Sequence, residues 1–556
     1  MDAVDIDDAG TEGTAGTRGR SLAAGVASGA LLIAVLTAMS RLLGLARTVV
    51  FAQTVGAGCL GTAYVTANQV PNLIYELAIG GALASAMVPV LARSAHRSLS
   101  DPAEKEHVTA VTSALLTWSV LILLPATLAI VAVARPVAGL LIPVNHNSSC
   151  DRSAMIGQTT DLLIAFAPQI FFYGISVVLN GLLQAYRKFT APNLAPVLAN
   201  VVTISAFLLF AMLDKNQPVT STPLAAQLVL SIGTTMNIGM LVLVALPPTF
   251  RLRLRLRPTL RFPPGVVQRA SGLALVGLLE FIASDVQSVV TIGLANGHGD
   301  TGALVLNNYT VLVFTSMCSV LPVAIVTSVF PVLSAADGAE FDRTSAGSTR
   351  AVMLMSWLAS AVIVAVCLPA AHVLAREPDQ VTQLAQAFLL AAPGVAGFAV
   401  ITNTSRVMFA IGKVRAAGVG LTAGPLLQLA ASIALVNLAP PRLVVPALSL
   451  ASTFAMLVVA VPMVVAVRRF RGPAAIEGLG QATLAGLAAF AAAGVAGAGV
   501  TLLAPHGGKV FEAAVGALAT LLALLVFGVV AYCVDKRDLG TAVSRLRLWR
   551  SGRIAR

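Results

Sequence analysis

The chain has 556 residues, of which 57% are apolar and only 11% are charged. Soluble globular proteins carry about a quarter charged residues, so this composition excludes an ordinary water-soluble fold and makes lipid the solvent for much of the chain. The formal net charge of +12 does not indicate a nucleic-acid-binding protein, because the arginines fall in short loops between apolar runs, as membrane topology requires.

Residues 1–20 begin acidic and are rich in Gly and Thr, which predicts a disordered cytoplasmic tail without a cleavable signal. The rest of the chain is a series of apolar runs. A run needs about 20 residues to cross the hydrocarbon core of a bilayer. The sequence predicts an all-α polytopic membrane protein with about fourteen transmembrane helices, near residues 22–53, 60–91, 108–134, 160–185, 193–213, 224–246, 267–295, 303–333, 351–373, 384–410, 416–438, 444–467, 478–504 and 510–534.

The distribution of basic residues tests this count. An even number of spans puts both termini on one side of the membrane. With that side in the cytoplasm, most of the 36 Lys and Arg residues fall in cytoplasmic segments, as the positive-inside rule requires. We therefore expect a multi-pass protein of a bacterial cytoplasmic (inner) membrane with both termini in the cytoplasm.

A short repeat divides the chain into two halves. The second run ends in Ala86-Met-Val-Pro-Val-Leu-Ala and the eighth, six helices later, in Ser328-Val-Phe-Pro-Val-Leu-Ser. The alternative is chance similarity of apolar helix ends. Duplicated units that rock around a shared site are a transporter architecture, so we predict two pseudo-symmetric six-helix lobes plus two C-terminal helices. The predicted segments are the tail (1–20), an N-lobe (21–250), a basic cytoplasmic linker (251–266), a C-lobe (267–472), helices thirteen and fourteen (473–535) and a basic cytoplasmic tail (536–556).

The motifs of an enzyme are missing from the sequence. It has no nucleotide-binding loop, no metal-ligand spacing among its cysteines and histidines, and no nucleophile beside a base. We expect no catalytic residue, no metal and no cofactor other than a coupling ion, sodium or proton, or the membrane potential.

The first predicted helix carries a polar stripe. Ser40, Arg41 and Arg47 share about 120° of one face with Gly44, at 100° per residue. Arginine suits phosphate because its planar fork donates two parallel hydrogen bonds. The stripe therefore predicts an anion-binding surface in a water-filled cavity, and the alternative is that the arginines snorkel to the interface.

The second helix carries a matching stripe of Asn68, Gln69, Asn72 and Glu76 beside Pro71. Such residues either line a cavity or act as polar contacts between helices. We expect them to contribute to the substrate site.

The seventh helix contains two carboxylates, Glu280 and Asp285. An intramembrane carboxylate is a candidate proton or sodium site. The alternative is a structural, hydrogen-bonded acid.

Two cysteines, Cys59 and Cys150, fall in predicted outer loops, where oxidation is possible. A disulfide needs the two Cα atoms within about 7 Å. Nothing in the sequence brings these loops together, so free thiols are favoured over a disulfide.

Arginines recur on the predicted cytoplasmic side. Residues 251–257 alternate Arg with Leu, and the tail repeats the pattern from Arg545 to Arg550. This is either a topology signal or a surface that binds anionic lipids, to which each Arg contributes about 1 kcal/mol.

Several motifs resemble one known family. They are Ser40-Arg41-Leu-Leu-Gly44-x-x-Arg47, Val70-Pro71-Asn72-Leu73, Gly81-Ala82, Val88-Pro89-Val90-Leu91, Leu182-Leu183-Gln184-Ala185, Pro196-Val197-Leu198-Ala199-Asn200 and Phe330-Pro331-Val332-Leu333. Over roughly residues 24–535 the chain resembles the lipid II flippase family MurJ/MviN, in the multidrug/oligosaccharidyl-lipid/polysaccharide exporter superfamily. The resemblance implies fourteen helices around a central cationic cavity, and a groove from helices thirteen and fourteen for a polyprenyl tail. It also implies transfer of the undecaprenyl-diphosphate-linked peptidoglycan precursor, lipid II, from the inner to the outer leaflet by alternating access.

The chain departs from the family pattern as a divergent, actinobacterial-like member would. Arg41 and Arg47 match the first-helix arginines, but the usual second-helix pair is here Tyr75-Glu76, and Leu312 replaces an eighth-helix arginine. The expected partners are a polyprenyl-diphosphate-linked substrate and anionic membrane lipids.

Three alternatives stay open. They are a flippase for another polyprenyl-linked glycan, a drug/cation antiporter of the same fold, and a non-transporting scaffold that binds cell-wall synthesis proteins. An antiporter predicts a cavity dominated by carboxylates, and a scaffold predicts that Arg41 and Arg47 tolerate substitution.

Overall fold

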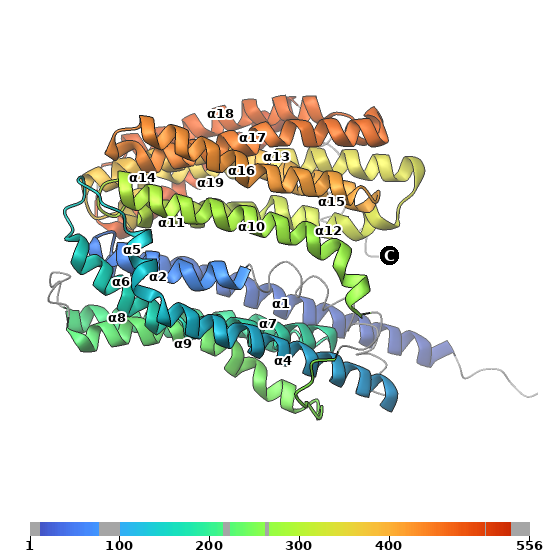
Figure 1. Ribbon diagram of the computed structural model, residues 1–556. Helices are drawn as coiled ribbons and strands as arrows, with labels where there is room; N and C mark the ends of the chain where they lie inside the picture. Colours follow the sequence, from blue (N-terminus) through green and yellow to red (C-terminus); the bar gives the residue numbers. More distant parts are fainter. Residues whose placement is uncertain (1–11, 77–100, 215–222, 262–265, 506, 535–556) are drawn as a thin grey trace, which may run out of the picture.

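The computed structural model describes residues 12–76, 101–214, 223–261, 266–505 and 507–534 (Figure 1). Within these ranges the chain is helical and has no strand. The helices are α1 (Glu12–Thr54), α2 (Cys59–Tyr75), α4 (Pro102–Ala132), α5 (Ala134–Leu141), α6 (Arg152–Phe166), α7 (Pro168–Ala185), α8 (Thr190–Asp214), α9 (Leu224–Phe250), α10 (Val266–His298), α11 (Ala303–Val320), α12 (Pro322–Ala335), α13 (Gly338–Leu374), α14 (Pro378–Ala391), α15 (Gly394–Ala410), α16 (Val414–Leu438), α17 (Val444–Arg471), α18 (Leu479–Leu503) and α19 (Lys509–Val534).

Thirteen of the fourteen predicted membrane spans are confirmed in position within the described residues. Thirteen segments of the described chain are long and apolar enough to cross a membrane, and each overlaps one predicted run. The remaining run begins as α2, whose continuation over residues 77–91 lies outside the described residues. Two other expectations also fall on residues that the structure does not describe. They are the first copy of the repeat, at Ala86, and the basic tail from residue 536.

The start of α1 corrects one expectation. Residues 12–20 were expected to be disordered, but α1 begins at Glu12. Residues 12–20 include three glycines and two threonines, which are poor helix formers, so the helix there depends on extension from the apolar segment that follows, which needs no new nucleus.

The helices form two layers that correspond to the predicted lobes (Figure 1). The described helices of the N-lobe are α1, α2 and α4–α9, of which α8 packs against α1 and α9, and α4 against α7. The C-lobe consists of α10–α17, and the last two helices, α18 and α19, pack against its α13.

Two spans six helices apart break at the same kind of sequence. Span four is interrupted between α6 and α7 at Ala167-Pro168, and span ten between α14 and α15 at Ala392-Pro393. Proline lacks the amide hydrogen of the helix ladder and is tolerated in the first turn of a new helix. The matching breaks support the pseudo-symmetry of the lobes.

The two lobes are joined at one end of the bundle, called here the disulfide end because it carries Cys59 and Cys150 (left in Figure 1). Asn145 of the N-lobe donates hydrogen bonds to the carbonyl oxygens of Asn296 and Gly299, each at 2.8 Å. Gly302 lies against Ala57 with φ +88°, and a Cβ there would overlap the Ala57 carbonyl. Only glycine combines a positive φ with the lack of a Cβ atom. Gly302 therefore allows the two lobes to approach closely at this point.

A layer of aromatic rings lies beside this junction. Phe51 packs against Tyr64 with ring centroids 5.1 Å apart, against Phe207 at 5.3 Å and against Tyr309 of the C-lobe at 6.4 Å. All four side chains are buried. The layer therefore separates the interior of the bundle from the disulfide end.

The linker is bound to the N-lobe as a strap. Leu252 and Leu254 pack against buried residues of α4 and α7, while Arg251, Arg253 and Arg255 are exposed. Farther along, the strap is fixed to α4 by hydrogen bonds from the Arg257 amide to Ser113 Oγ, from the Thr259 amide to Thr117 Oγ1 and from Trp118 Nε1 to the Leu260 carbonyl, each at 3.1 Å. The alternation of Arg and Leu thus separates an outer charged face from an inner apolar one. The end of the bundle that carries residues 251–261 is called the linker end.

The structure corrects the expectation for Cys59 and Cys150, which form a disulfide with their Cα atoms 5.7 Å apart. Cys59 is the first residue of α2, and Cys150 lies just before α6. Because α2 and α6 pack side by side, the two cysteines meet despite 91 residues of separation.

We predict that breaking this bond destabilises the protein. Cys59→Ser with Cys150→Ser releases a long loop in the unfolded chain, which typically costs about 2–4 kcal/mol, so the double variant should melt at a lower temperature. Mass spectrometry after thiol labelling of the unfolded, unreduced wild type should find only Cys318, Cys367 and Cys533 modified. Labelling of Cys59 and Cys150 without reductant would contradict the prediction.

Candidate functional site

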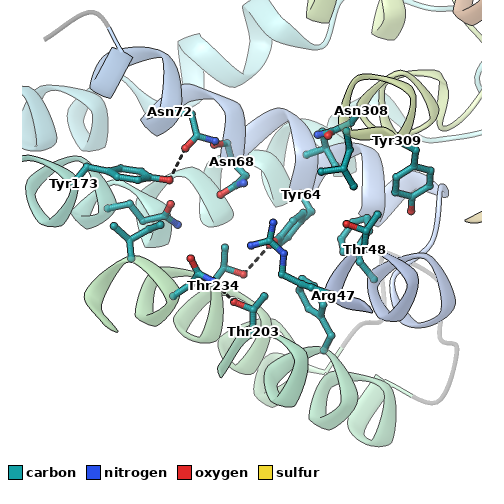
Figure 2. Close-up of a pocket in the computed structure, with 17 residues that line it drawn as sticks. Arg47, Thr48, Tyr64, Asn68, Asn72, Tyr173, Thr203, Thr234, Asn308 and Tyr309 are labelled. Atoms are coloured by element: carbon teal, nitrogen blue, oxygen red, sulfur yellow. Dashed lines mark hydrogen bonds between the residues drawn. The ribbon is translucent and has the colours of Figure 1, made fainter. Parts of the chain in front are cut away.

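A cavity of ≈ 200 Å³ lies between the lobes, next to the aromatic layer (Figure 2). It is called the arginine cavity, because Arg47 is the one charged side chain among its lining residues. Five N-lobe helices and α11 of the C-lobe line it. Its polar lining includes Arg47, Asn68, Asn72, Gln169, Tyr173, Thr203, Thr234, Asn237 and Asn308.

Arg47 has no counter-ion among the described residues. Its side chain is half-buried, and Figure 2 shows the guanidinium in the space bounded by Tyr64, Thr203 and Thr234. An unpaired arginine in a membrane-spanning segment is costly unless it faces water or a ligand. Its five N–H donors are therefore available to an anion.

The wall around Arg47 is held by hydrogen bonds between neighbouring helices. Tyr173 donates to Asn72 Oδ1 at 2.7 Å, and the hydroxyls of Tyr64 and Thr234 lie 2.9 Å apart (Figure 2). On the far wall, Asn237 of α9 donates to Thr203 Oγ1 of α8 at 2.7 Å. These bonds fix the side chains before any ligand arrives.

Two buried donors at the arginine cavity lack partners. The Nε2 atom of Gln169 and the hydroxyl of Tyr309 have no hydrogen-bond partner among the described residues, although the side chains are only 1% and 3% exposed. Leaving a buried donor unsatisfied costs about 1–3 kcal/mol. Both residues line the same cavity as Arg47, so the cavity offers hydrogen-bond donors that the protein itself leaves unused.

A second cavity of ≈ 300 Å³ lies deeper in the C-lobe and contains no charged side chain among its lining residues. It is called the neutral pocket and is formed mainly by α10, α11, α16 and α17. More than half of its lining residues carry an amide or a hydroxyl. The neutral pocket meets the arginine cavity at Asn308, which lines both.

A third cavity, of ≈ 340 Å³, is the apolar groove between α1, α11, α13 and α19. Thr48 and Thr520 are the only side chains with polar atoms among its lining residues. Thr48 and Leu312 line both the groove and the arginine cavity.

At the disulfide end, Arg376 and Lys509 both contact Gln53.

The predicted site residues are only partly brought together. Arg47, Asn68 and Asn72 line the arginine cavity, and Gln69 lines the neutral pocket. Leu312, at the position of the missing family arginine, does lie at the cavity wall.

Ser40, Arg41 and Glu76 do not line these cavities. Arg41 is exposed and lies six residues before Arg47, which on an α-helix is about 9 Å and 120° away. The two arginine side chains therefore point in directions too far apart to reach the same cavity. The Ser40 carbonyl accepts a hydrogen bond from Asn200 at 3.3 Å, and Glu76, exposed at the end of α2, forms no ion pair with Arg41 or Arg47.

The two carboxylates of α10 lie away from the three cavities. Asp285 is buried, and its Oδ1 atom has no hydrogen-bond partner among the described residues. Glu280 is half-buried. Of the two carboxylates, Asp285 is therefore the one with a buried oxygen atom that can still accept a proton or bind a cation.

Several cavity residues are not identifiable from sequence reasoning alone. Gln169, Tyr173, Gln428 and Ser432 are single polar residues in apolar runs, and each reaches a cavity only through the packing of different helices. The one sequence signal that points to them is a polar residue at membrane depth. The same signal also marks polar residues with a purely structural role, so it does not identify cavity residues.

The fold and the cavities define an integral membrane transporter of two helical lobes. The sequence profile of the family described as Lipid II flippase MurJ matches residues 51–518, which is most of the chain. The protein therefore belongs to the MurJ family.

Individual relatives and solved structures agree with this assignment. The chain is 28% identical over 312 residues to a lipid II flippase MurJ of Burkholderia cenocepacia, and 25% identical over 298 residues to a probable lipid II flippase MurJ of Rhizobium tropici. The matches cover 55% and 53% of this chain, and the chain spans about half the length of these relatives, 56% and 52%.

Two solved structures share the fold. A lipid II flippase MurJ in an inward closed conformation superposes with a TM-score of 0.69 at 17% identity, covering 92% of this chain and 99% of that one. An inward-facing multidrug resistance transporter of the MATE family and MOP superfamily gives 0.60 at 15% identity, covering 81% and 99%.

Proposed function

We propose that this protein is a flippase that moves the undecaprenyl-diphosphate-linked peptidoglycan precursor, lipid II, from the inner to the outer leaflet by alternating access. The observation that carries the proposal is the order of the three cavities. An apolar groove, a cavity with one arginine and a neutral polar pocket adjoin one another in that order. A polyprenyl tail, a diphosphate and a glycan follow one another in the same order in the substrate.

In this proposal, Arg47 binds the diphosphate. Its guanidinium supplies the one positive charge among the described lining residues, and Gln169 and Tyr309 add neutral donors. Asn68 and Asn72 orient the bound group from α2. Leu312 stands where the family pattern has an arginine, and it lines both the groove and the arginine cavity. In this proposal Arg47 therefore binds the diphosphate that several arginines bind in the family pattern.

The membrane orientation follows from charge. The positive-inside rule favours a cytoplasmic linker end, with both termini on that side of the bacterial inner membrane. The lobes are then closed on the outer side by the aromatic layer and the Gly302 contact. Release to the outer leaflet requires these contacts to open while the lobes close at the linker end.

One rival is disfavoured by the lining residues. A cation antiporter needs carboxylates in its cavity, whereas the described residues that line the three cavities include no carboxylate. A flippase for another polyprenyl-linked glycan would use the same groove and arginine. The proposed activity is transport, without a covalent step.

Replacing Arg47 should weaken substrate binding without lowering the thermal stability of the protein. Purified Arg47→Gln should bind undecaprenyl diphosphate about ten- to a hundredfold more weakly, because hydrogen bonds to charged groups contribute about 1.5–3 kcal/mol. Arg47→Lys should be intermediate, since lysine lacks the bidentate fork. Both variants should melt like the wild type, because Arg47 has no partner to lose.

The matched control is Arg471→Gln. Arg471 pairs with Asp342 at 2.8 Å and lies 4.7 Å over the Phe341 ring, so this change should cost about 1 kcal/mol of stability and leave binding unaffected. Wild-type affinity in Arg47→Gln would rule out the diphosphate role and favour a scaffold.

We further propose that Asp285 carries the coupling proton or sodium ion. A buried carboxylate with a free oxygen in a membrane helix is stable only when it is protonated, bound to an ion or hydrated. In proteoliposomes, Asp285→Asn should abolish the acceleration of flipping by an imposed proton or sodium gradient. Glu280→Gln, five residues away on α10, serves as control and should retain it. An unchanged response in Asp285→Asn would assign coupling elsewhere or to the membrane potential alone.

The exposed arginines of the strap are proposed to bind anionic lipids of the cytoplasmic leaflet. Replacing Arg251, Arg253, Arg255 and Arg257 by Gln should remove the dependence of flipping rate on the anionic lipid content of the vesicles, since each Arg contributes about 1 kcal/mol near such a surface. Leu252 and Leu254 still hold the strap in place. Reporter fusions should show the wild-type topology. An identical lipid dependence in wild type and variant would leave the strap a topology signal only.

A further inference from the structure

The turn between α10 and α11, residues 299–302, is held by two separate segments of the N-lobe at the disulfide end. One is the segment before α2. Its Ala57 carbonyl lies against Gly302 and accepts a hydrogen bond from Gln380 of α14 at 3.3 Å. The other is the α5–α6 loop, residues 142–151. The C-lobe turn therefore lies between two parts of the N-lobe that are far apart in sequence.

The α5–α6 loop holds the turn by polar contacts. The side-chain amide of Asn145 donates to the carbonyl oxygens of Asn296 and Gly299, each at 2.8 Å. The backbone amide and the hydroxyl of Ser149 each lie 3.1 Å from the hydroxyl of Thr301, which is part of the turn. These hydrogen bonds form only while the lobes are together, so they contribute to closure of the disulfide end.

The disulfide joins the two segments beside their contacts with the C-lobe. Cys59 lies two residues after Ala57, and Cys150 directly follows Ser149. A segment that is already ordered loses less conformational entropy when it meets its partner. With the disulfide formed, the two segments meet the C-lobe turn as one preformed surface. Without it, the α5–α6 loop has more freedom to lose each time the lobes close.

We propose that the Cys59–Cys150 disulfide makes these two segments a redox-sensitive clasp on the outer gate, which is the set of contacts between the lobes at the disulfide end. The oxidised clasp favours the state that is closed on the outer side. Reduction of the disulfide shifts the protein toward the outward-open state. The inference rests on the proposed flippase function, which puts the disulfide end on the outer side of the membrane.

The reduction is a thiol–disulfide exchange with an external dithiol. One thiolate of the dithiol attacks a sulfur atom and breaks the Cys59–Cys150 bond, and the second thiol then displaces the first, so that the donor leaves as its own disulfide. Two electrons and two protons pass to the protein, which is left with two thiols. Both cysteines are half-buried rather than enclosed, so a reductant on the outer side can reach them.

Spin labels on the two lobes measure the opening directly. Leu224 at the start of α9 and Leu438 at the end of α16 are 70% and 84% exposed, and both lie at the disulfide end. Leu224→Cys and Leu438→Cys, with the exposed Cys533 replaced by Ser, are labelled before reduction with a nitroxide that is attached through a thioether. Dipolar distance measurements in nanodiscs then give the fractions of closed and open molecules.

In the otherwise wild-type protein, dithiothreitol should raise the ratio of open to closed molecules about three- to tenfold, which is the usual effect of one neutral hydrogen bond. Thr301→Val removes the hydroxyl that Ser149 contacts and leaves the disulfide intact, and it should raise the ratio by a similar factor. Dithiothreitol should have a smaller effect in Thr301→Val than in the wild type, because contacts that act as a unit are not additive.

The matched control is Thr382→Val in α14. The Thr382 hydroxyl donates to the Pro378 carbonyl of its own helix at 3.1 Å, so the ratio and its response to dithiothreitol should equal those of the wild type. In Cys59→Ser with Cys150→Ser, the ratio should be raised from the start and should not respond to dithiothreitol.

The outcomes separate the clasp from the flippase proposal. A wild-type ratio that does not respond to dithiothreitol would overturn the clasp and leave the disulfide a purely stabilising bond. An equal response in the wild type and Thr301→Val would also overturn it, because the disulfide would then act independently of the lobe contact. A redox-dependent gate in a protein that does not bind undecaprenyl diphosphate would instead overturn the proposed substrate and leave the clasp standing.

Discussion

The arrangement of this protein depends on the guanidinium of Arg47, which lies in a membrane-spanning helix and has no counter-ion among the described residues. Arg47 faces a cavity rather than lipid, because a lone arginine against hydrocarbon is strongly unfavourable. The surrounding walls are neutral and hydrogen-bonded to one another, as between Tyr173 and Asn72, so the protein does not neutralise the charge internally. The positive charge is left for a ligand, and the nature of the adjoining cavities defines what that ligand is: apolar on one side and polar but uncharged on the other.

A ligand with these three parts cannot cross while both ends of the cavity are open. The contact between Gly302 and Ala57 and the rings of Phe51 and Tyr309 close the disulfide end by joining the two lobes. The Cys59–Cys150 bond strengthens the N-lobe side of this junction, because it holds the loop that carries Asn145. These contacts are many but individually weak, and within the described part of the chain none of those joining the lobes there is an ion pair. Such an interface suits the proposed transport cycle, in which the lobes separate and rejoin.

Much of the fold was predictable, since span length and hydropathy reflect local constraints that a bilayer imposes on every helix. The position of Arg47 at a cavity could be predicted for the same reason, because a charged residue at membrane depth must face protein or water. The remaining errors concern contacts between distant segments. The disulfide partner of Cys59 depends on how α2 packs against α6, and the cavity that Ser432 lines depends on how α16 packs against α17. No pattern within one helix contains this information. Arg41 was misplaced because a helical face of about 120° is wider than the wall of the cavity.

The most direct test of the central claim is complementation of a bacterial strain depleted of its own lipid II flippase. Expression of this chain should restore growth and normal cell shape if it flips the undecaprenyl-diphosphate-linked precursor. A chain that is inserted in the inner membrane at comparable levels, yet leaves the strain unable to grow while lipid II accumulates in the inner leaflet, would contradict the account.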